Sequence, residues 1–341
     1  MMRGLASLHP AYFALVMATG IVSIAARLMD LPVVPVVLLW ANVAFFAALC
    51  VLLVLRVVHF GDRVRADLLH HGRAVGFFTI PAAICVMGSQ WLIVAGAWGV
   101  ARVCWIAGTI AWAVITYGVL TVLTVKADKP SLAEGINGGW LVVVVAAQSV
   151  SVLGTQLAPG FGAHAPAVLF MSLVIWLGAG MLYIWIISLI FYRYTFFTMQ
   201  PSDLAPPYWV NMGAVAISTL AGALLALAAP AWSVIGELLP FVKGLTLMFW
   251  ATATWWIPML VLLGVWRHGY RRFPLRYDPL YWGAVFPLGM YTAATVRLSH
   301  ALQIPALLVI PRVFVFIALG AWTATLVGLA AEAVAARRRR A

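Results

Sequence analysis

Phe286, Pro287 and Arg297 are the residues whose types and spacing carry the most chemical information in this sequence. Pro287 has no backbone N–H, so a helix running through it loses the hydrogen bond to the carbonyl of Gly283 and bends. A Phe ring beside such a bend can block an enclosed space, although an aromatic in an apolar helix more often simply packs. Arg297 follows Phe286 by 11 residues, roughly 16 Å along an α-helix, where its charge would attract anions.

The elements that must position these residues are ten apolar runs. Hydrophobic residues make up 65% and charged residues 9% of the 341-residue chain, whereas a soluble domain is roughly a quarter charged. Each run is close to or above the ~20 residues that a helix needs to cross a bilayer. The runs lie at residues 11–27, 33–57, 75–95, 100–124, 138–157, 165–192, 208–229, 240–266, 280–301 and 307–334. The sequence therefore predicts an all-α integral membrane protein with ten transmembrane helices in a single transmembrane domain, residues 1–341.

Lys and Arg are concentrated in every second gap between the runs. Of the 21, 16 lie on one side of the predicted membrane, and the other five are Arg27, Arg102, Lys243, Arg297 and Arg312. Because loops rich in Lys and Arg stay in the cytoplasm, we predict a multi-pass protein of the cell's inner (plasma) membrane with both termini cytoplasmic. The basic cytoplasmic tail, residues 337–341, would contact anionic lipid headgroups, and nucleic acid is not expected as a partner.

An aromatic residue begins each odd-numbered run and reveals an internal repeat. The leading aromatics are Tyr12, Phe77, Trp140, Tyr208 and Tyr281. Their spacings of 65, 63, 68 and 73 residues indicate five copies of one helical hairpin. The first run also resembles a cleaved signal peptide, with Arg3 before it and Ala25-Ala26 near its end, but it shares the repeat.

The odd-numbered runs carry small and hydroxylated residues, whereas the even-numbered runs are almost uniformly apolar and suit contact with lipid. We therefore expect a quasi-five-fold ring with the odd helices inside and the even helices outside. A ring of five helices encloses an axis, and small polar residues facing it would leave a pore. The predicted pore-lining residues are Thr19, Gly20, Gly88, Ser149, Asn211, Gly213, Ser218 and Thr292. The alternative for each is that small residues let neighbouring helices approach closely.

The charges indicate which solutes would cross. Of the nine acidic residues, all but Glu332 lie in predicted loops or at helix ends. A cation pathway or a carboxylate proton relay places Asp or Glu at membrane depth, so an anion or a neutral solute is favoured and obligatory proton coupling is disfavoured. Arg297 and Arg27 would form an anion-attracting mouth on the outer side, unless they extend to lipid phosphates as helix-end arginines do.

Catalytic and metal sites are not predicted. Cys50, Cys85 and Cys104 fall in three separate runs without C-x-x-C spacing, so they are expected to be buried apolar residues. An intramembrane enzyme would need His, Asp, Glu or Cys side chains that converge at membrane depth. The polar segment with His59, His70, His71, Asp62 and Asp67 is the place where a metal could bind, but a solvated loop is favoured because no ligand spacing recurs.

Several segments resemble the tellurite-resistance/dicarboxylate transporter family, which includes plant slow anion channels and bacterial tellurite-resistance proteins. They are Pro10-Ala-Tyr-Phe with Met17-Ala-Thr-Gly20, Gly76-Phe-Phe-Thr79, Pro207-Tyr-Trp-Val-Asn-Met-Gly-Ala214, and the aromatic–Phe286-Pro287 stretch. The resemblance covers nearly the whole chain. It implies ten helices in a quasi-five-fold ring, a homotrimer with one pore per subunit, and Phe286 as the occluding ring. Members carry different solutes, including malate-like dicarboxylates, sulfite, chloride, nitrate and tellurite.

The sequence thus predicts a membrane channel or transporter that moves small anions through a central pore gated by Phe286 and Pro287, without a cofactor. The alternative is an exporter of C4-dicarboxylates, sulfite or tellurite, with or without proton coupling.

Overall fold

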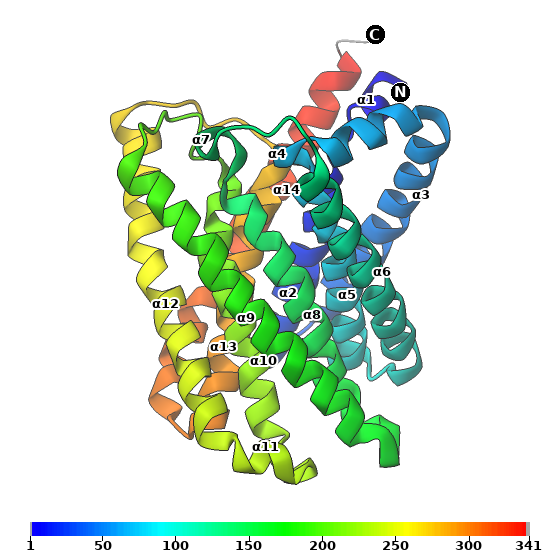
Figure 1. Ribbon diagram of the computed structural model, residues 1–341, viewed down its shortest axis with the longest axis vertical. Helices are drawn as coiled ribbons and strands as arrows, with labels where there is room; N and C mark the ends of the chain where they lie inside the picture. Colours follow the sequence, from blue (N-terminus) through cyan, green and yellow to red (C-terminus); the bar gives the residue numbers. More distant parts are fainter. Residues whose placement is uncertain (1, 339–341) are drawn as a thin grey trace.

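The protein is built of helices joined by short connections, with no strand, in residues 2–338, the part of the chain that the computed structural model describes (Figure 1). The prediction of an all-α protein is therefore confirmed. Within that range, eight helical segments are long and apolar enough to cross a membrane. One of them, Gly138–Phe196, contains two long helices, and the predicted run 280–301 is not among the eight. Of the predicted basic tail 337–341, residues 339–341 lie outside the described residues.

Ten helices of at least 15 residues make up the bundle between residues 2 and 338. Five of them match the odd-numbered runs: α2 (Ala14–Leu28), α5 (Thr79–Ala95), α8 (Val142–Leu157), α10 (Val210–Leu227) and α13 (Trp282–Leu302). The other five match the even-numbered runs: α3 (Val34–Leu69), α6 (Trp98–Val125), α9 (Ala165–Phe196), α12 (Leu239–Val265) and α14 (Val309–Arg338). Short helices α1 (Met2–Ala6), α4 (His71–Ala74), α7 (Leu132–Gly135) and α11 (Ser233–Glu237) lie in the connections.

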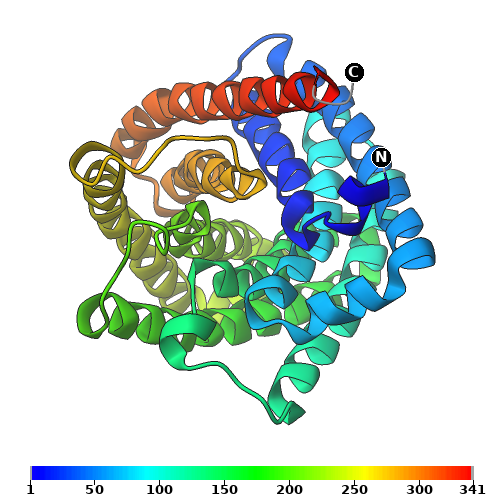
Figure 2. The same cartoon turned by 90° about the horizontal axis from the view of Figure 1, so that it is seen from above.

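The two groups of helices differ in burial. The apolar segments that contain α2, α5 and α10 are 67–89% buried, and those that contain α3, α6, α12 and α14 are 17–22% buried. Helix α2 packs against α5, α5 against α8, α8 against α10, α10 against α13, and α13 against α2, so their contacts close a cycle. Each of the five also packs against the long helix that follows it in the chain, which lies on its outer side (Figure 2).

The start of each inner helix is a tight 3₁₀ turn that contains the leading aromatic residue. The five turns are η1 (Pro10–Phe13), η2 (Val75–Phe78), η3 (Gly138–Leu141), η5 (Pro206–Trp209) and η8 (Pro279–Tyr281). His9, Asn137 and Asp278 each stand three residues before the leading aromatic, and each side chain accepts a backbone N–H two residues further on. The aromatic spacing therefore reflects a repeated helix-start geometry.

The segment after residue 57, predicted to be a solvated loop, is helical instead. Helix α3 continues to Leu69 with a bend at Phe60, because no proline or turn sequence interrupts it before His70. The Asp67 carboxylate accepts hydrogen bonds from Arg56 at 2.7 Å and from Arg73 at 2.5 Å. Arg56 is 2% exposed and also donates to the carbonyl of Ala6. This ion cluster fastens the start of the chain to α3 and occupies Asp67.

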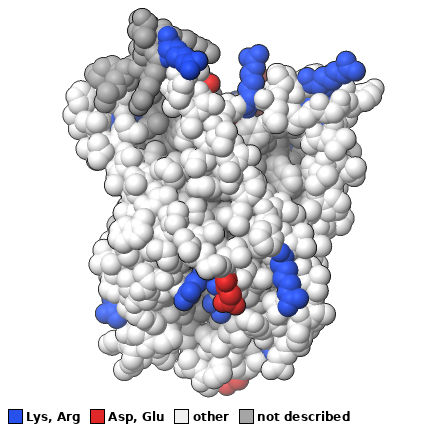
Figure 3. All heavy atoms as spheres, turned by 180° about the vertical axis from the view of Figure 1, so that it is seen from behind, with Lys and Arg blue, Asp and Glu red and all other residues white. Residues whose placement is uncertain are grey.

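Charge is distributed as a membrane-spanning bundle requires. On the face shown in Figure 3, Lys and Arg gather toward the two ends and leave an uncharged belt between them. Large apolar side chains are exposed on the outer helices, such as Trp185 and Phe316 at 63% and 62%. Residues 2 and 338, the first and last that the structure describes, lie at the same end of the bundle (Figure 1), which we call the terminal face.

Gly138 provides the first test of this packing. A Cβ atom at Gly138 would overlap backbone atoms of Pro207 and Tyr208, where η3 crosses η5. Because backbone cannot move aside like a side-chain tip, we expect Gly138→Ala to destabilise the fold by about 1–3 kcal/mol. The measurement is thermal unfolding of the detergent-solubilised protein. Gly118→Ala is the control, since a Cβ there meets open space, and equal unfolding midpoints for the two variants would contradict the contact.

His9 makes stability depend on pH. Burial, followed by the nearby guanidinium of Arg73, lowers the pKa of His9 from 6.5 to about 4. The unfolded chain therefore binds the proton first, and folded-state stability falls as pH decreases from 6.5 to 4. At roughly 1.4 kcal/mol per pKa unit, the loss amounts to at most ~3.5 kcal/mol.

His9→Asn retains a capping acceptor but does not titrate. We expect the unfolding midpoint of the wild type to fall more steeply than that of His9→Asn between pH 6.5 and 4. His59→Asn, at an exposed position, should keep the wild-type profile. Parallel profiles for the wild type and His9→Asn would refute this source of pH dependence.

Candidate functional site

Two cavities lie along the axis of the inner helices, one above the other. The larger, of about 240 Å³, opens at the terminal face, and its wall includes Ala14, Thr79, Val142, Val210 and Gly283. The smaller holds about 20 Å³, room for about one water molecule. Its wall includes Ile21, Val86, Ser149, Ile217 and Met290. Every inner helix thus contributes to both cavities.

The wall residues follow the internal repeat. In each inner helix the residue at the smaller cavity comes seven positions after the residue at the larger one, as Ile21 follows Ala14. Seven residues are two helical turns, roughly 10 Å along the axis. The five wall positions of the larger cavity are separated by 65, 63, 68 and 73 residues, the same spacings as the leading aromatics. The five copies therefore present the same face to the axis.

Between the two cavities lies a layer of buried residues. The residues three positions after the larger-cavity wall are Met17, Ala82, Val145, Gly213 and Phe286. All five are buried, and none of them lines either cavity. Phe286 is the largest of them and is 1% exposed. It belongs to the α13 stripe that also carries Gly283 and Met290, since residues three and four apart share one helix face.

Pro287 lies toward α10. A Cβ atom at Gly213 would be 2.6 Å from Cγ of Pro287, so α10 and α13 touch at this point. The proline therefore both removes a backbone hydrogen bond from α13 and packs into the space that a glycine leaves on the neighbouring helix.

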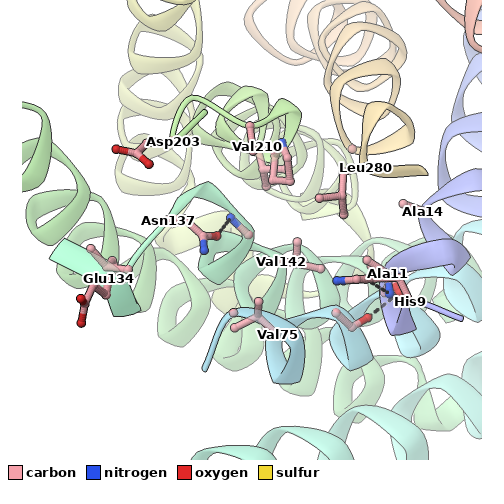
Figure 4. A pocket seen from close by; sticks show the side chains of 18 of the residues that line it. His9, Ala11, Ala14, Val75, Glu134, Asn137, Val142, Asp203, Val210 and Leu280 are labelled. Carbon is pink, nitrogen blue, oxygen red and sulfur yellow. Dashed lines mark hydrogen bonds between the residues drawn. The ribbon is translucent and has the colours of Figure 1, made fainter. Parts of the chain in front are cut away.

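The larger cavity combines an apolar wall with charges at its edge (Figure 4). Glu134 and Asp203 lie at one edge, and His9 lies at the opposite edge. The Glu134 carboxylate accepts from the hydroxyl of Ser131, and that of Asp203 accepts from the backbone N–H of Gln200. Both carboxylates are thus held by neighbouring loop groups.

Arg193, at the end of α9, is the buried cation of the larger cavity. Its guanidinium donates to the carbonyl of Ala133 at 2.6 Å and to the hydroxyl of Tyr208, and it lies 3.7 Å from Asp203. Two of these partners are neutral, so its charge is compensated only in part. The contacts also fasten the loop before α8 to the start of α10.

All five inner helices begin at the larger cavity and run away from it. The first-turn N–H groups of an α-helix lack intrahelical acceptors and carry a partial positive charge. Five N-termini converging on one cavity therefore make its potential more positive than the side chains alone would.

The smaller cavity is mostly apolar, with four polar residues in its wall: Ser89, Ser149, Gln156 and Arg297. Gln156 has a buried Oε1 without a donor. Arg297 is partly buried, and within residues 2–338 its guanidinium has neither an ion pair nor a hydrogen bond. An unpaired cation beside one amide side chain in a narrow apolar space can hold a small anion. Arg27, the other predicted mouth residue, is exposed and lies away from both cavities.

Of the eight predicted pore-lining residues, Ser149 lies in a cavity wall. Thr19 instead accepts a hydrogen bond from the indole of Trp322 on α14, at 3.0 Å. Ser218 accepts from Gln148, and the Asn211 amide donates to Tyr194 on α9. The Thr292 hydroxyl donates to the carbonyl of Leu288 in its own helix.

The predicted glycines lie where helices meet. A Cβ atom at Gly20 would contact Val86 of α5 and Asn42 of α3, and one at Gly88 would contact Leu153 of α8. Gly213 faces Pro287, as described above. The alternative of close packing therefore describes these residues.

Sequence reasoning missed His9, Arg193 and Gln156, although all three line a cavity. The repeated wall residues did carry a signal, because they recur two and nine positions after each leading aromatic, as Ala14 and Ile21 follow Tyr12, but none of the three missed residues stands at these positions. Metal-site candidates are not assembled: among residues 2–338, no three His, Cys, Asp or Glu side chains come close enough together to hold an ion.

Comparison with known proteins agrees with a membrane transport role. An uncharacterized membrane protein of Mycobacterium tuberculosis is 40% identical over 149 residues, which cover 43% of this chain and 75% of the relative. Two uncharacterized transporters of Methanocaldococcus jannaschii are 26% and 23% identical over 295 and 291 residues. These matches cover 84% and 83% of this chain and 82% of each relative.

A family model described as voltage-dependent anion channel matches residues 7–330, nearly the whole chain, in agreement with the resemblance seen in the sequence. The protein is therefore a member of the voltage-dependent anion channel family, a family of membrane anion channels and transporters.

Proposed function

We propose that the protein conducts small anions along the axis of its inner helices, through the two cavities, and that Phe286 closes the passage between them. The observation that carries this proposal is the shared register, which brings five equivalent helix faces to one axis and leaves a buried layer between two cavities. If the inner helices only formed a close-packed core, the five copies of the repeat would not all have to line open space at the levels of both cavities.

Phe286 is the best candidate for the gate. Three of the four equivalent residues are small, namely Ala82, Val145 and Gly213, so one aromatic ring supplies much of the bulk at that level. The Phe286 side chain turns on two bonds, and Pro287 beside it weakens the helix backbone at the same point. Both features allow the ring to move without rebuilding the other four helices.

Anion preference follows from the charges at each level. An anion entering the larger cavity meets five helix N-termini and Arg193, and farther along it meets the unpaired Arg297. The two carboxylates, Glu134 and Asp203, lie at the edge, and no carboxylate lines the smaller cavity within residues 2–338. An inside-negative potential would drive anions outward by ~2.3 kcal/mol per charge per 100 mV.

The membrane arrangement belongs to the same proposal. We take all ten long helices to cross the membrane in a quasi-five-fold ring, with α13 inside it and shielded from lipid, so that its polar residues are tolerated. The bias of Lys and Arg places the terminal face in the cytoplasm of the cell's plasma membrane. We include in the proposal a homotrimer with one pore per subunit, which the family resemblance supports.

An exporter of C4-dicarboxylates is the second candidate, favoured by the volume of the larger cavity. Its 240 Å³ exceeds what a chloride or nitrate ion needs and would admit a small organic dianion. Flux into proteoliposomes, compared for nitrate, chloride, sulfite, malate and tellurite, separates the candidates. The same assay tests sulfite and tellurite export. Repeating it with an imposed pH gradient shows whether that export is coupled to protons. Absence of flux for every anion would contradict both.

Phe286→Ala tests the gate. We expect nitrate or chloride flux to rise by at least about tenfold, corresponding to a barrier lower by ~1.4 kcal/mol, because the ring no longer fills the layer between the cavities. Phe316→Ala, on the exposed face of α14, is the matched control and should leave flux unchanged. A folded Phe286→Ala protein with wild-type flux would rule out Phe286 as the gate.

Arg297→Gln tests the attraction of anions at the smaller cavity. A unit charge acting on an ion about 10 Å away is worth ~1–2 kcal/mol at an effective dielectric constant near 20, so we expect its removal to lower anion flux about five- to thirtyfold. Arg27→Gln removes an exposed charge from the last turn of α2 and should have a smaller effect. Equal effects of the two substitutions would show that Arg297 acts as a surface charge.

A further inference from the structure

A groove lies between α13 and α14, apart from the two cavities on the axis; Figure 2 shows where the two helices run. Its volume is about 450 Å³. Ala284 and Leu288 of α13 form its floor, and Ala321, Ala324 and Gly328 line it from α14. The three α14 residues are spaced by three or four positions and share one helix face. Their small side chains cannot fill the space between the helices, and the groove results.

Tyr277 fixes the end of this groove nearest the terminal face. Its ring lies so close to Gly328 that a Cβ atom there would be 3.0 Å from Cδ2. Its hydroxyl accepts a hydrogen bond from the indole N–H of Trp282, which is fully buried. The wall of the groove is therefore held in place by a hydrogen bond from an inner helix.

A second apolar hollow, of about 240 Å³, lies beside the first. Leu260 and Leu263 of α12 line it, and it shares Trp209, Leu275 and Tyr281 with the first groove. Two apolar troughs therefore lie on the two sides of one wall. This arrangement matches a molecule with two hydrocarbon chains joined at one end.

Cations stand at the rim of both troughs. Arg276 lines the first groove and Arg267 lines the second, and the same connection also contains Arg271 and Arg272. Within residues 2–338 none of the four forms an ion pair. The nearest carboxylate in sequence, Asp278, accepts the backbone N–H of Leu280 instead.

Arg267 lacks a hydrogen-bond acceptor at one of its guanidinium nitrogen atoms. Its guanidinium lies over the ring of Phe273, 4.4 Å from the centroid, and its Nε is buried without a hydrogen-bond partner. Unsatisfied buried donors are costly. A phosphate at the rim would neutralise the arginines and supply acceptor oxygens.

We propose that these two hollows bind one anionic diacyl phospholipid, with its phosphate between Arg267 and Arg276 and one acyl chain in each trough. The rim lies at the end of the bundle where charged side chains gather, at the depth of lipid headgroups. The outer helices of a second copy of the chain would offer apolar side chains to the troughs, but within residues 2–338 their exposed carboxylates are Asp62 and Glu332 alone, whereas the rim needs a negative charge directly beside the troughs. The lipid satisfies both.

Native mass spectrometry of the full-length protein tests the proposal, with phosphatidylglycerol and phosphatidylcholine of identical acyl chains as probes. We expect the wild type to retain phosphatidylglycerol preferentially. Each arginine near the surface contributes about fivefold in affinity, so the double variant Arg267→Gln/Arg276→Gln should lose most of this preference. Arg63→Gln/Arg65→Gln, which removes two exposed arginines of α3, should keep it.

Filling the trough tests the acyl-chain part independently. Ala324→Trp should abolish retention of phosphatidylglycerol, while Val313→Trp, on the exposed face of the same helix, should not. Equal retention of the two lipids by the wild type, or unchanged preference in the arginine double variant, would overturn the proposal. Unchanged lipid retention in Ala324→Trp together with an altered oligomeric state would assign the groove to a second copy of the chain instead. None of these readouts depends on anion flux.

Discussion

Close contact between neighbouring inner helices is the constraint on which the rest of the structure depends. Where η3 crosses η5, Gly138 brings backbone against backbone, and Gly213 receives Pro287 one repeat further on. These contacts fix the distance of each inner helix from the axis. At such distances, side chains of ordinary length do not fill the centre between five helices. Open space therefore remains along the axis, except where a large side chain such as that of Phe286 occupies it. Packing between neighbouring inner helices thus sets the width of the space along the axis.

The positions of the polar groups follow from the same constraint. Hydroxyl and amide side chains in a membrane need partners, and here they find them between helices: Thr19 with Trp322, Ser218 with Gln148, and Tyr183 with the carbonyl of Asn211. Such bonds stabilise the contacts of inner helices with one another and with outer helices, and they leave the axis largely apolar at the level of the smaller cavity. At that level four polar residues reach the axis, namely Ser89, Ser149, Gln156 and Arg297.

Much of the fold was predictable because each copy of the repeat begins with the same type of residue. The aromatic spacing marks five equivalent helix starts, and the structure adds an N-cap residue in the same register at His9, Asn137 and Asp278. The direction of individual side chains was not predictable from composition, since Gly, Ser and Thr serve close packing and polar walls equally well. Only the helical register tells which of these residues face the axis and which face a neighbouring helix. To set that register, one residue that lines the axis must be known, such as Ala14 or Ile21. Arg193 was missed because its role depends on a loop, residues 198–205, that folds back over the end of its helix.

In the proposed pathway, an anion is attracted at both cavities and meets apolar residues between them. Met17, Ala82, Val145 and Phe286 offer no hydrogen bond to replace lost hydration, so the layer is a barrier even where space exists. A gate of this kind opens by admitting water rather than by breaking a strong bond, which suits a small movement of one ring. The reverse face of α13 near that ring, at Ala284 and Leu288, forms the floor of the lipid groove. Whatever fills that groove therefore packs against the segment that must move, and the surrounding membrane becomes part of the gate's mechanical environment.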